Sequence, residues 1–468
     1  MREKLPAAYM ERIGTQLGDE AEAFLGSYEK PRTFGLRFNS SKLVGLETIT
    51  SRIKKQFGLS PVPWCEDGFY YDEDKRPGKH PFHAAGLYYI QEPSAMSAVH
   101  LLRPMPGETV LDLAAAPGGK TTQIAALLQG NGLLIANEIH PGRAKILSEN
   151  VERCGFANVV VTNETPGRLA TRFPAFFDKI MLDAPCSGEG MFRKDPDTIA
   201  EWSPAHVEMC ASRQLDIVRD AIKMLKPRGL LGYSTCTFAP EENERNIAAM
   251  LAEEPLLELV AMEQIWPHRE RGEGHFVAVM RLTGGSENRP SIIAESRHNR
   301  TKSHSHGKGG GAGKTGAGAA TAAWRAFEAF AVNHAPGLLF PSVQPLLFGE
   351  HLYALPLDTA GCFSSTMLDG LKVVRPGLHV AELKKDRIEP AHALALHMPW
   401  HAQDGVQLDS DGDEILAYLR GETITGFPSA VGWTLIRVNG FPIGWGKGSD
   451  GQVKNHYPKG LRWLGRSF

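Results

Sequence analysis

The sequence predicts an α/β fold, with a doubly wound and mostly parallel sheet between residues 86 and 283 and a smaller unit on either side. Short apolar runs alternate with helical stretches through this central part, and that order is typical of parallel sheets covered by helices on both faces. Glycine-rich or polar motifs directly follow several of the apolar runs. Because such sheets bind ligands beyond the carboxyl ends of their strands, we expect one site at that edge.

Composition narrows the class of protein before any motif is considered. The chain has 468 residues, of which 42% are hydrophobic and 22% charged, as in globular proteins and unlike disordered chains. The net charge of −2 means that only local basic patches can hold a polyanion. Six cysteines without a C-x-x-C pair argue against a disulfide scaffold and a zinc ribbon, and we expect no metal site.

The sequence also shows neither a secretory signal nor a membrane-spanning segment. Residues 1–19 carry charges throughout, unlike a secretory signal, and no apolar run approaches the roughly 18 residues of a membrane span. We therefore expect a cytoplasmic monomer with free thiols and no membrane partner.

The units outside the central part differ in composition. Residues 1–85 mix helical and strand-like pieces, which predicts an α+β extension; its basic residues Lys42, Arg52, Lys54 and Lys55 suit a polyanion, although a solvated helix face explains them as well. Residues 284–323 are rich in Gly, Ala, Ser and Lys, and we expect a flexible tether there. An intermediate segment, 324–385, and a β-rich module, 386–468, follow.

Individual elements follow from the same patterns. In the central part we expect strands at 109–113, 132–137, 158–162, 178–182 and 229–234, and helices at 121–128, 214–225 and 241–252. In the last module we expect strands at 432–438, 441–445 and 461–463. Basic residues lie among aromatic ones in this module, which suits phosphate contact with base stacking, although an ordinary charged surface explains the pattern equally well.

The turn after the first expected strand has the features of a nucleoside site. Its glycines allow the backbone to approach a ligand, and the amides of the following helix point at that ligand. Glu138 ends the next strand about 20 residues later, where an acid suits a ribose diol. The turn consists of Ala114, Ala115, Ala116, Pro117, Gly118, Gly119 and Lys120.

Two other glycine motifs compete with this interpretation. The turn lacks the G-x-G-x-x-G of dinucleotide sites, and Gly119-Lys120-Thr121 matches only the end of a P-loop, because Ala114 stands where the first glycine belongs. A nucleotide hydrolase that uses this turn remains an alternative enzyme class.

Two cysteines follow the fourth and fifth expected strands. Cys186 lies in Asp183-Ala-Pro-Cys and Cys236 in Ser234-Thr-Cys-Thr. If these parallel strands are neighbours, both thiols reach one cleft beside the cofactor turn. A lone cysteine is most often a small buried apolar residue, but two at adjacent strand ends fit that explanation poorly.

Taken together, Asp-Leu-Ala-Ala-Ala-Pro-Gly-Gly-Lys-Thr, Asp183-Ala-Pro-Cys186-Ser-Gly-Glu-Gly, Arg193-Lys-Asp-Pro196 and Ser234-Thr-Cys236-Thr resemble the Nol/Nop/Sun family of RNA cytosine-C5 methyltransferases. The order of motifs and the tethered C-terminal part are most similar to the bacterial RsmF branch, which modifies 16S ribosomal RNA. The resemblance covers residues 1–283 well, and the end of the chain is more weakly similar to an RNA-binding PUA-like module.

The resemblance implies a Rossmann-like methyltransferase core that uses S-adenosyl-L-methionine. The turn from Ala114 to Lys120 would hold the cofactor, Glu138 its ribose, and Asp183 would lie near both the cofactor and the target base. Thr165 aligns with the family's adenine-side acid, and the neighbouring Glu164 is the alternative. RNA, either ribosomal RNA within or outside a subunit or transfer RNA, is the implied partner.

The implied chemistry needs a thiolate, because carbon 5 of cytosine is a poor nucleophile until a sulfur adds to carbon 6. By resemblance Cys236 attacks and Cys186 assists product release, an order that the residues alone do not settle. Free cysteine is mostly protonated near neutrality, so a cation such as Lys120 would raise the thiolate fraction. A ribosome-assembly factor without activity is the remaining alternative, and the intact cysteine pair argues against it.

Overall fold

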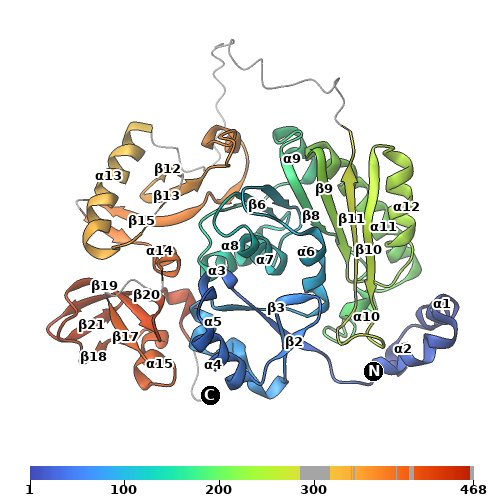
Figure 1. The fold of residues 1–468 in the computed structure, drawn as a ribbon, viewed down its shortest axis with the longest axis horizontal. Helices are drawn as coiled ribbons and strands as arrows, with labels where there is room; N and C mark the ends of the chain where they lie inside the picture. The colour runs from blue at the N-terminus through green and yellow to red at the C-terminus, as the bar shows by residue number, and fades with distance from the viewer. Residues whose placement is uncertain (285–316, 339, 341–342, 386, 400–404, 464–468) are drawn as a thin grey trace, which may run out of the picture.

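A computed structural model describes residues 1–284, 317–338, 340, 343–385, 387–399 and 405–463. In Figure 1 the sheet of the N-terminal extension lies below the central α/β domain, and the two C-terminal units lie on the left. The last unit shares a hydrophobic cluster with the N-terminal extension, which includes Leu36 and Ile415. Residues 285–316 of the expected tether lie outside the described residues. In the described part of the chain no helix combines the length and apolarity that crossing a bilayer requires.

The central domain is built on one eight-stranded sheet of order β10-β11-β9-β8-β5-β6-β7-β14. The five inner strands from β9 to β7 are parallel, and β10, β11 and β14 join antiparallel at the edges. The strands are β5 (Thr109–Asp112), β6 (Leu133–Asn137), β7 (Val159–Thr162), β8 (Phe177–Asp183), β9 (Leu225–Thr235), β10 (Leu257–Ile265), β11 (His275–Leu282) and β14 (Val373–Arg375).

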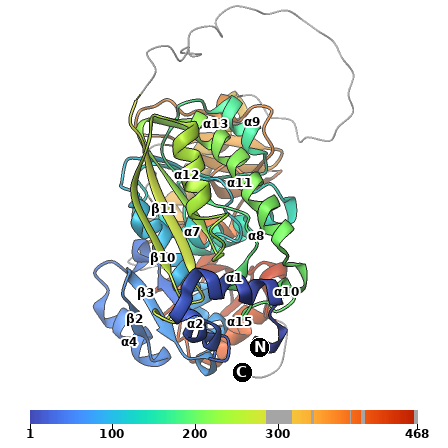
Figure 2. The same cartoon turned by 90° about the vertical axis from the view of Figure 1, so that its right-hand side faces the viewer.

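Helices cover both faces of this sheet, because neighbouring residues of each inner strand are apolar on both sides. Leu111 packs toward α9, α11 and α12, and Val110 packs in a second core with α6, α7 and α8. Figure 2 shows α11 and α12 together on one side. This arrangement confirms the doubly wound sheet. The helices are α6 (Ser97–Leu102), α7 (Gly119–Leu127), α8 (Pro141–Cys154), α9 (Pro166–Arg172), α10 (Thr198–Glu201), α11 (Pro204–Met224) and α12 (Glu244–Glu253).

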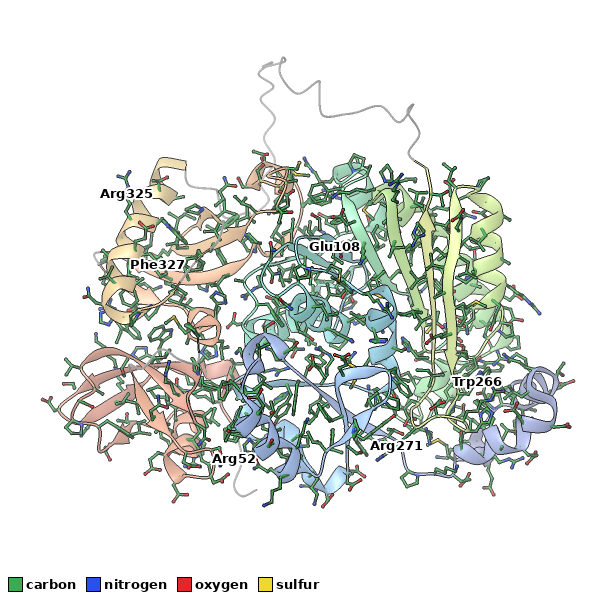
Figure 3. The ribbon with its side chains drawn as sticks, viewed as in Figure 1. Arg52, Glu108, Trp266, Arg271, Arg325 and Phe327 are labelled. Carbon is green, nitrogen blue, oxygen red and sulfur yellow. The ribbon has the colours of Figure 1, made fainter. Side chains whose placement is uncertain are left out.

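The N-terminal extension has two parts. A helix pair, α1 and α2, packs against the end of β10, where Phe24 meets Trp266 with ring centroids 5.6 Å apart, and Figure 3 shows Trp266 beside these helices. A four-stranded sheet of order β2-β3-β1-β4 follows. The elements are α1 (Ala7–Leu17), α2 (Ala21–Ser27), β1 (Phe34–Phe38), α3 (Ser40–Leu43), α4 (Glu47–Phe57), β2 (Ser60–Val62), β3 (Cys65–Tyr71), α5 (Pro81–Ala84) and β4 (Tyr88–Ile90).

Each C-terminal unit has its own sheet, of order β12-β13-β15-β16 in the first and β17-β19-β20-β21-β18 in the second. The hairpin β15–β16 spans residue 385, so the boundary expected there divides one hairpin. The elements are α13 (Ala317–His334), β12 (Val343–Phe348), β13 (His351–Pro356), β15 (Leu378–Lys384), β16 (Arg387–Pro390), α14 (His392–His397), β17 (Val406–Leu408), α15 (Asp413–Arg420), β18 (Ile424–Thr425), β19 (Gly432–Val438), β20 (Phe441–Ser449) and β21 (Gln452–Asn455).

Two local expectations are wrong. Residues 317–323, expected in the tether, form the first turns of α13, because alanine favours helix and Ala320 and Ala323 are buried in the core. The strand expected at 461–463 is absent from the described residues; a 3-10 helix, Lys459–Leu461, follows Pro458 instead. The N–H groups of Leu461 and Arg462 bond locally to Pro458 and Lys459, and that of Trp463 donates to Leu419 O. No strand of the described residues pairs with this segment.

Candidate active site

The two cysteines predicted at strand ends come together in the structure. β8 and β9 are parallel neighbours in which Asp183 lies beside Ser234, so the loops that follow them start at the same edge of the sheet. The Sγ atoms of Cys186 and Cys236 are 3.4 Å apart, and both residues are half-buried free thiols. The sheet order therefore produces the thiol pair.

Buried polar residues hold the loop that carries Cys186. The carboxylate of Glu242 accepts hydrogen bonds from the backbone N–H of Ser187 at 3.0 Å and from the amide of Gln214 at 2.7 Å, and it also contacts the Ser187 hydroxyl. Burial raises the pKa of Glu242 to about 7. The loop geometry thus depends on a carboxyl group that lies behind the thiols.

Cys186 is held in its protonated form by its surroundings. The hydrogen bond with Cys236 is the largest cause of a pKa well above that of a free thiol, followed by burial, the charge of Cys236 and the charge of Glu242. Only a thiolate attacks an electrophile efficiently. Cys186 therefore remains a neutral thiol near neutral pH and is poorly suited to attack.

Substitution of Cys236 by alanine is expected to make Cys186 more reactive, because the largest cause of its raised pKa is removed. We expect the pH midpoint for alkylation of Cys186 by iodoacetamide to fall by about one unit or more, which is a roughly tenfold faster reaction at pH 8. Mass spectrometry of the alkylated Cys186 peptide across a pH series measures this midpoint.

Glu242→Gln is the matched control. It removes a smaller cause of the raised Cys186 pKa and opens no space beside the Cys186 sulfur. It is expected to move the midpoint in the same direction by a smaller amount. A faster reaction at every pH with an unmoved midpoint would indicate better access alone and would contradict this assignment.

A buried lysine and a half-exposed aspartate form an ion pair beside the thiols. Lys120 Nζ lies 2.9 Å from Oδ1 of Asp183, with the lysine side chain 6% and the aspartate side chain 40% exposed. Ser234 donates a 2.8 Å hydrogen bond to the same carboxylate. Burial alone would raise the pKa of Asp183, but the Lys120 ammonium outweighs it and the net pKa is lowered. Asp183 therefore stays ionised, and the positive charge of Lys120 is directed at Asp183.

His275, at the start of β11, lies near this pair and was not predicted from the sequence. Its Nε2 is 3.9 Å from Oδ1 of Asp183 and has no hydrogen-bond partner among the described residues. Burial, then the charge of Lys120, lowers its pKa to about 3, so the ring is neutral. No local motif marks this histidine, because β11 reaches the site only through its pairing with β9.

The predicted cofactor turn occupies the end of β5 and the start of α7. Gly118 adopts the left-handed region with φ of 115° and leaves the amino end of α7 without a side-chain cap within the described structure. Ala115 N–H donates to Asn137 O at the end of β6. The amides at this end, which no described side chain caps, fit an anionic or polar ligand. Ala114 to Ala116 contribute only methyl side chains to the turn.

Two acids flank this turn, and both already have partners among the described residues. Glu138 lies at the end of β6, its Oε1 accepts the N–H of His140 at 2.9 Å, and Arg143 is 3.4 Å from its Oε2. Glu164 is occupied on both oxygens, by the N–H of Lys372 at 2.7 Å and by Arg168 at 2.9 Å. Thr165 caps α9 through its hydroxyl. A carboxylate at the position of Glu138 fits a diol.

The N-terminal helices contact the cysteine loop directly, which the sequence did not indicate. Glu189 is fully buried and accepts from Arg12 of α1 at 2.6 Å, from the Trp202 indole at 2.8 Å and from the backbone N–H of Phe238 at 3.0 Å. Gly190 N–H donates to Cys236 O at 2.7 Å, and a Cβ at Gly190 would lie 2.9 Å from that oxygen. The extension thus supports both cysteine loops.

The sheet is doubly wound, and in the described residues the helix after its first strand has no side-chain cap, its second strand ends at a buried acid, and two thiols follow its fourth and fifth strands. This arrangement is that of an S-adenosyl-L-methionine methyltransferase. Family models match along the chain: the 16S rRNA methyltransferase RsmB/F model at residues 99–281, the N-terminal domain of 16S rRNA methyltransferase RsmF at 5–93, the RsmF first C-terminal domain at 329–398 and the RsmF PUA domain at 406–463. The chain belongs to the RsmB/F family of 16S rRNA methyltransferases.

Individual relatives agree with this assignment over the whole length. The chain is 32% identical to ribosomal RNA small subunit methyltransferase F of Vibrio vulnificus strain YJ016 over 98% of this chain and 97% of that protein, and 30% identical to the protein of the same name from Enterobacter sp. strain 638 over 100% and 95%. A methyltransferase homologue from Pyrococcus horikoshii superposes with a TM-score of 0.53 and 31% identity over 58% of this chain and 93% of that chain. NSun6 of the same organism, crystallised with SFG, shares the fold at a TM-score of 0.54 and 22% identity over 61% and 100%.

Proposed function

We propose that this protein methylates carbon 5 of a cytosine in small-subunit (16S) ribosomal RNA through a covalent adduct between Cys236 and the base. The observation that carries the proposal is the 3.4 Å approach of the Cys186 and Cys236 sulfur atoms beside the Asp183–Lys120 pair. A monomer in the cytoplasm is the proposed setting.

The roles of the two cysteines are assigned from the family resemblance, and the raised pKa of Cys186 supports them. Cys236 adds to carbon 6 of the target cytosine, and carbon 5 then has the electron density to form a bond. Asp183, held ionised by Lys120, accepts a hydrogen bond from the amino edge of the base and stabilises the ring as it gains a proton. The proton on carbon 5 must leave before the Cys236–carbon 6 bond breaks, and Cys186 is adjacent to take part in that release.

The cofactor site follows from the residues around α7. Ala114 to Lys120 would hold S-adenosyl-L-methionine, with Glu138 at its ribose, Thr165 or Glu164 on the adenine side and Asp183 near its reactive end. When bound, the cofactor supplies an electrophilic methyl group.

RNA is proposed to reach the thiols along a groove between the N-terminal extension and the central domain. Arg32 lies over the Phe34 ring at 4.5 Å and Arg271 over the Tyr70 ring at 4.4 Å; both line a cavity that extends to Arg193, just after the cysteine loop. Figure 3 shows Arg271 at this junction. Cations beside aromatic rings suit phosphate contact and base stacking.

Charge reversal of this groove should weaken RNA binding without changing the chemical step. For the double variant Arg32→Glu/Arg271→Glu we expect KM to rise at least tenfold with kcat within about twofold, and the slope of log affinity against log salt to shrink by roughly 2, because two phosphate contacts are lost. Steady-state kinetics at several salt concentrations measure KM, kcat and the salt dependence. Arg325→Glu, on α13, is the control and should leave both quantities unchanged.

The substrate itself is tested with RNA from cells that lack the gene. The purified protein and S-adenosyl-L-methionine are incubated with 30S subunits, with naked 16S RNA and with bulk transfer RNA, and 5-methylcytosine is mapped by bisulfite sequencing. We expect methylation of a defined cytosine in 16S RNA. Methylation confined to transfer RNA would show that transfer RNA, and not 16S RNA, is the substrate. ATP hydrolysis or RNA binding without any methylation would overturn the proposed function.

A further inference from the structure

A cluster of metal-binding side chains lies in the first C-terminal unit, on strands that carry none of the residues described above. Nδ1 of His351 is 3.3 Å from Nε2 of His379 and 3.8 Å from Oε1 of Glu382. The three ligand atoms all lie within 4.8 Å of one another. Two ligands of one ion, each at about 2.0–2.2 Å from it, lie at most about 4.4 Å apart, so small side-chain shifts suffice.

A β-bulge places these side chains on one face. His351 of β13 pairs with Glu382 of β15, and Tyr353 pairs with His379, with a register shift between Leu352 and Tyr353. In a regular strand His379 and Glu382, three positions apart, would face opposite sides. The extra residue of a bulge changes the direction of the side chains that follow it. The backbone irregularity is thus what creates the cluster.

Neighbouring residues orient two of the three candidate ligands. Lys384 Nζ lies 2.9 Å from Oε2 of Glu382, which leaves Oε1 toward His351, and Glu350 at 3.1 Å balances the Lys384 charge. His379 stacks on Tyr353 with ring centroids 4.8 Å apart. Outer partners of this kind orient metal ligands in known sites.

We propose that His351, His379 and Glu382 bind one divalent transition metal ion, zinc or a similar ion, with water in an open position. Two imidazoles and one carboxylate suit zinc, cobalt or nickel, whereas calcium and magnesium prefer oxygen ligands alone. The ion joins β13 to β15 next to Arg375, which pairs with Glu152 of α8 at 3.1 Å. It therefore stabilises the face of this unit that packs on the central domain.

Cobalt binding to the full-length protein tests the proposal, in a parent that carries Cys186→Ser, Cys236→Ser, His304→Ala and His306→Ala. These changes remove the thiol pair and the closely spaced histidines of the Gly-rich segment, which are competing ligands. We expect one equivalent of Co²⁺ to bind with micromolar or tighter affinity, to give ligand-field absorption without a sulfur charge-transfer band, and to be displaced by Zn²⁺.

Single substitutions then locate the ion. In this parent, His351→Ala and His379→Ala should each weaken Co²⁺ binding at least thirtyfold, and Glu382→Gln about tenfold. His351 is 48% exposed, so its removal does not threaten folding even if that of His379 does. His100→Ala, at an exposed histidine of α6, should leave binding unchanged. Absence of Co²⁺ binding by the parent, or binding that survives His351→Ala, overturns the proposal.

Discussion

Replacement of Cys186 by alanine is expected to trap the protein on its RNA as a covalent adduct that survives denaturation. Cys236 still adds to the base in this variant, but the neighbouring thiol that assists release, 3.4 Å away in the native site, is missing. Replacement of Cys236 by alanine should abolish both adduct and product, a loss of at least about 10⁴-fold, because no covalent step remains. A denaturing gel with labelled RNA, together with a methyl-transfer assay, measures both outcomes.

The double variant Cys186→Ala/Cys236→Ala distinguishes chemistry from folding in this experiment. It should form no adduct, and its thermal unfolding should resemble that of Cys186→Ala alone. If Cys236→Ala accumulates the adduct and Cys186→Ala is simply inactive, the roles of the two thiols are reversed. DNA cytosine-C5 methyltransferases attack from their Pro-Cys motif, which corresponds here to Cys186, so this reversal has a precedent in related chemistry.

Breaking the Lys120–Asp183 ion pair is expected to give the second-largest loss of methyl-transfer activity. It should also lower the stability of the fold, and the two losses can be measured separately. Asp183→Asn should reduce methyl transfer about 10³-fold, since the carboxylate that stabilises the protonated base is lost. It also leaves the buried Lys120 ammonium without its counter-charge, which should cost about 2–3 kcal/mol. Lys120→Met should cost less, about 1–2 kcal/mol, because Asp183 is 40% exposed and water partly replaces the lysine.

The charge-neutral double variant Lys120→Met/Asp183→Asn separates the two effects. No unpaired charge remains, so we expect calorimetric unfolding to recover most of the lost stability while methyl transfer stays as low as in Asp183→Asn. Recovery of activity along with stability would mean that the pair serves only the fold. If the double variant is no more stable than either single variant, Lys120 and Asp183 do not stabilise each other in the folded state.

The sequence predicted the convergence of the candidate site residues, because each of them lies at the carboxyl end of a parallel strand. The turn after β5, Glu138 after β6 and the two cysteine loops have clear local patterns, and the right-handed winding of such sheets brings the strand ends to one edge. The convergence of Cys186 and Cys236 follows once β8 and β9 are taken as neighbours.

Contacts between residues far apart in the sequence could not be predicted in the same way, because they depend on which strands and helices pack together. His275 reaches Asp183 only because β11 adds antiparallel to β9, and Arg12 reaches Glu189 across 177 positions of sequence. The cluster of His351, His379 and Glu382 depends on a bulge, which alternation of apolar residues does not reveal. The strand expected at 461–463 was wrong because local β propensity says nothing about whether a partner strand is available.

The last strand of the central sheet has a consequence for how the protein is made. β14 covers β7, and the adjacent Lys372 bonds both to Asn163 and to Glu164 in the loop beside Thr165. The ribosome releases β7 long before residue 372 is synthesised, so the nascent domain carries an open sheet edge while the intervening chain is translated. The domain that performs the chemistry is therefore completed only when the downstream unit emerges, and a shortened gene that stops after β11 would leave that edge uncovered permanently.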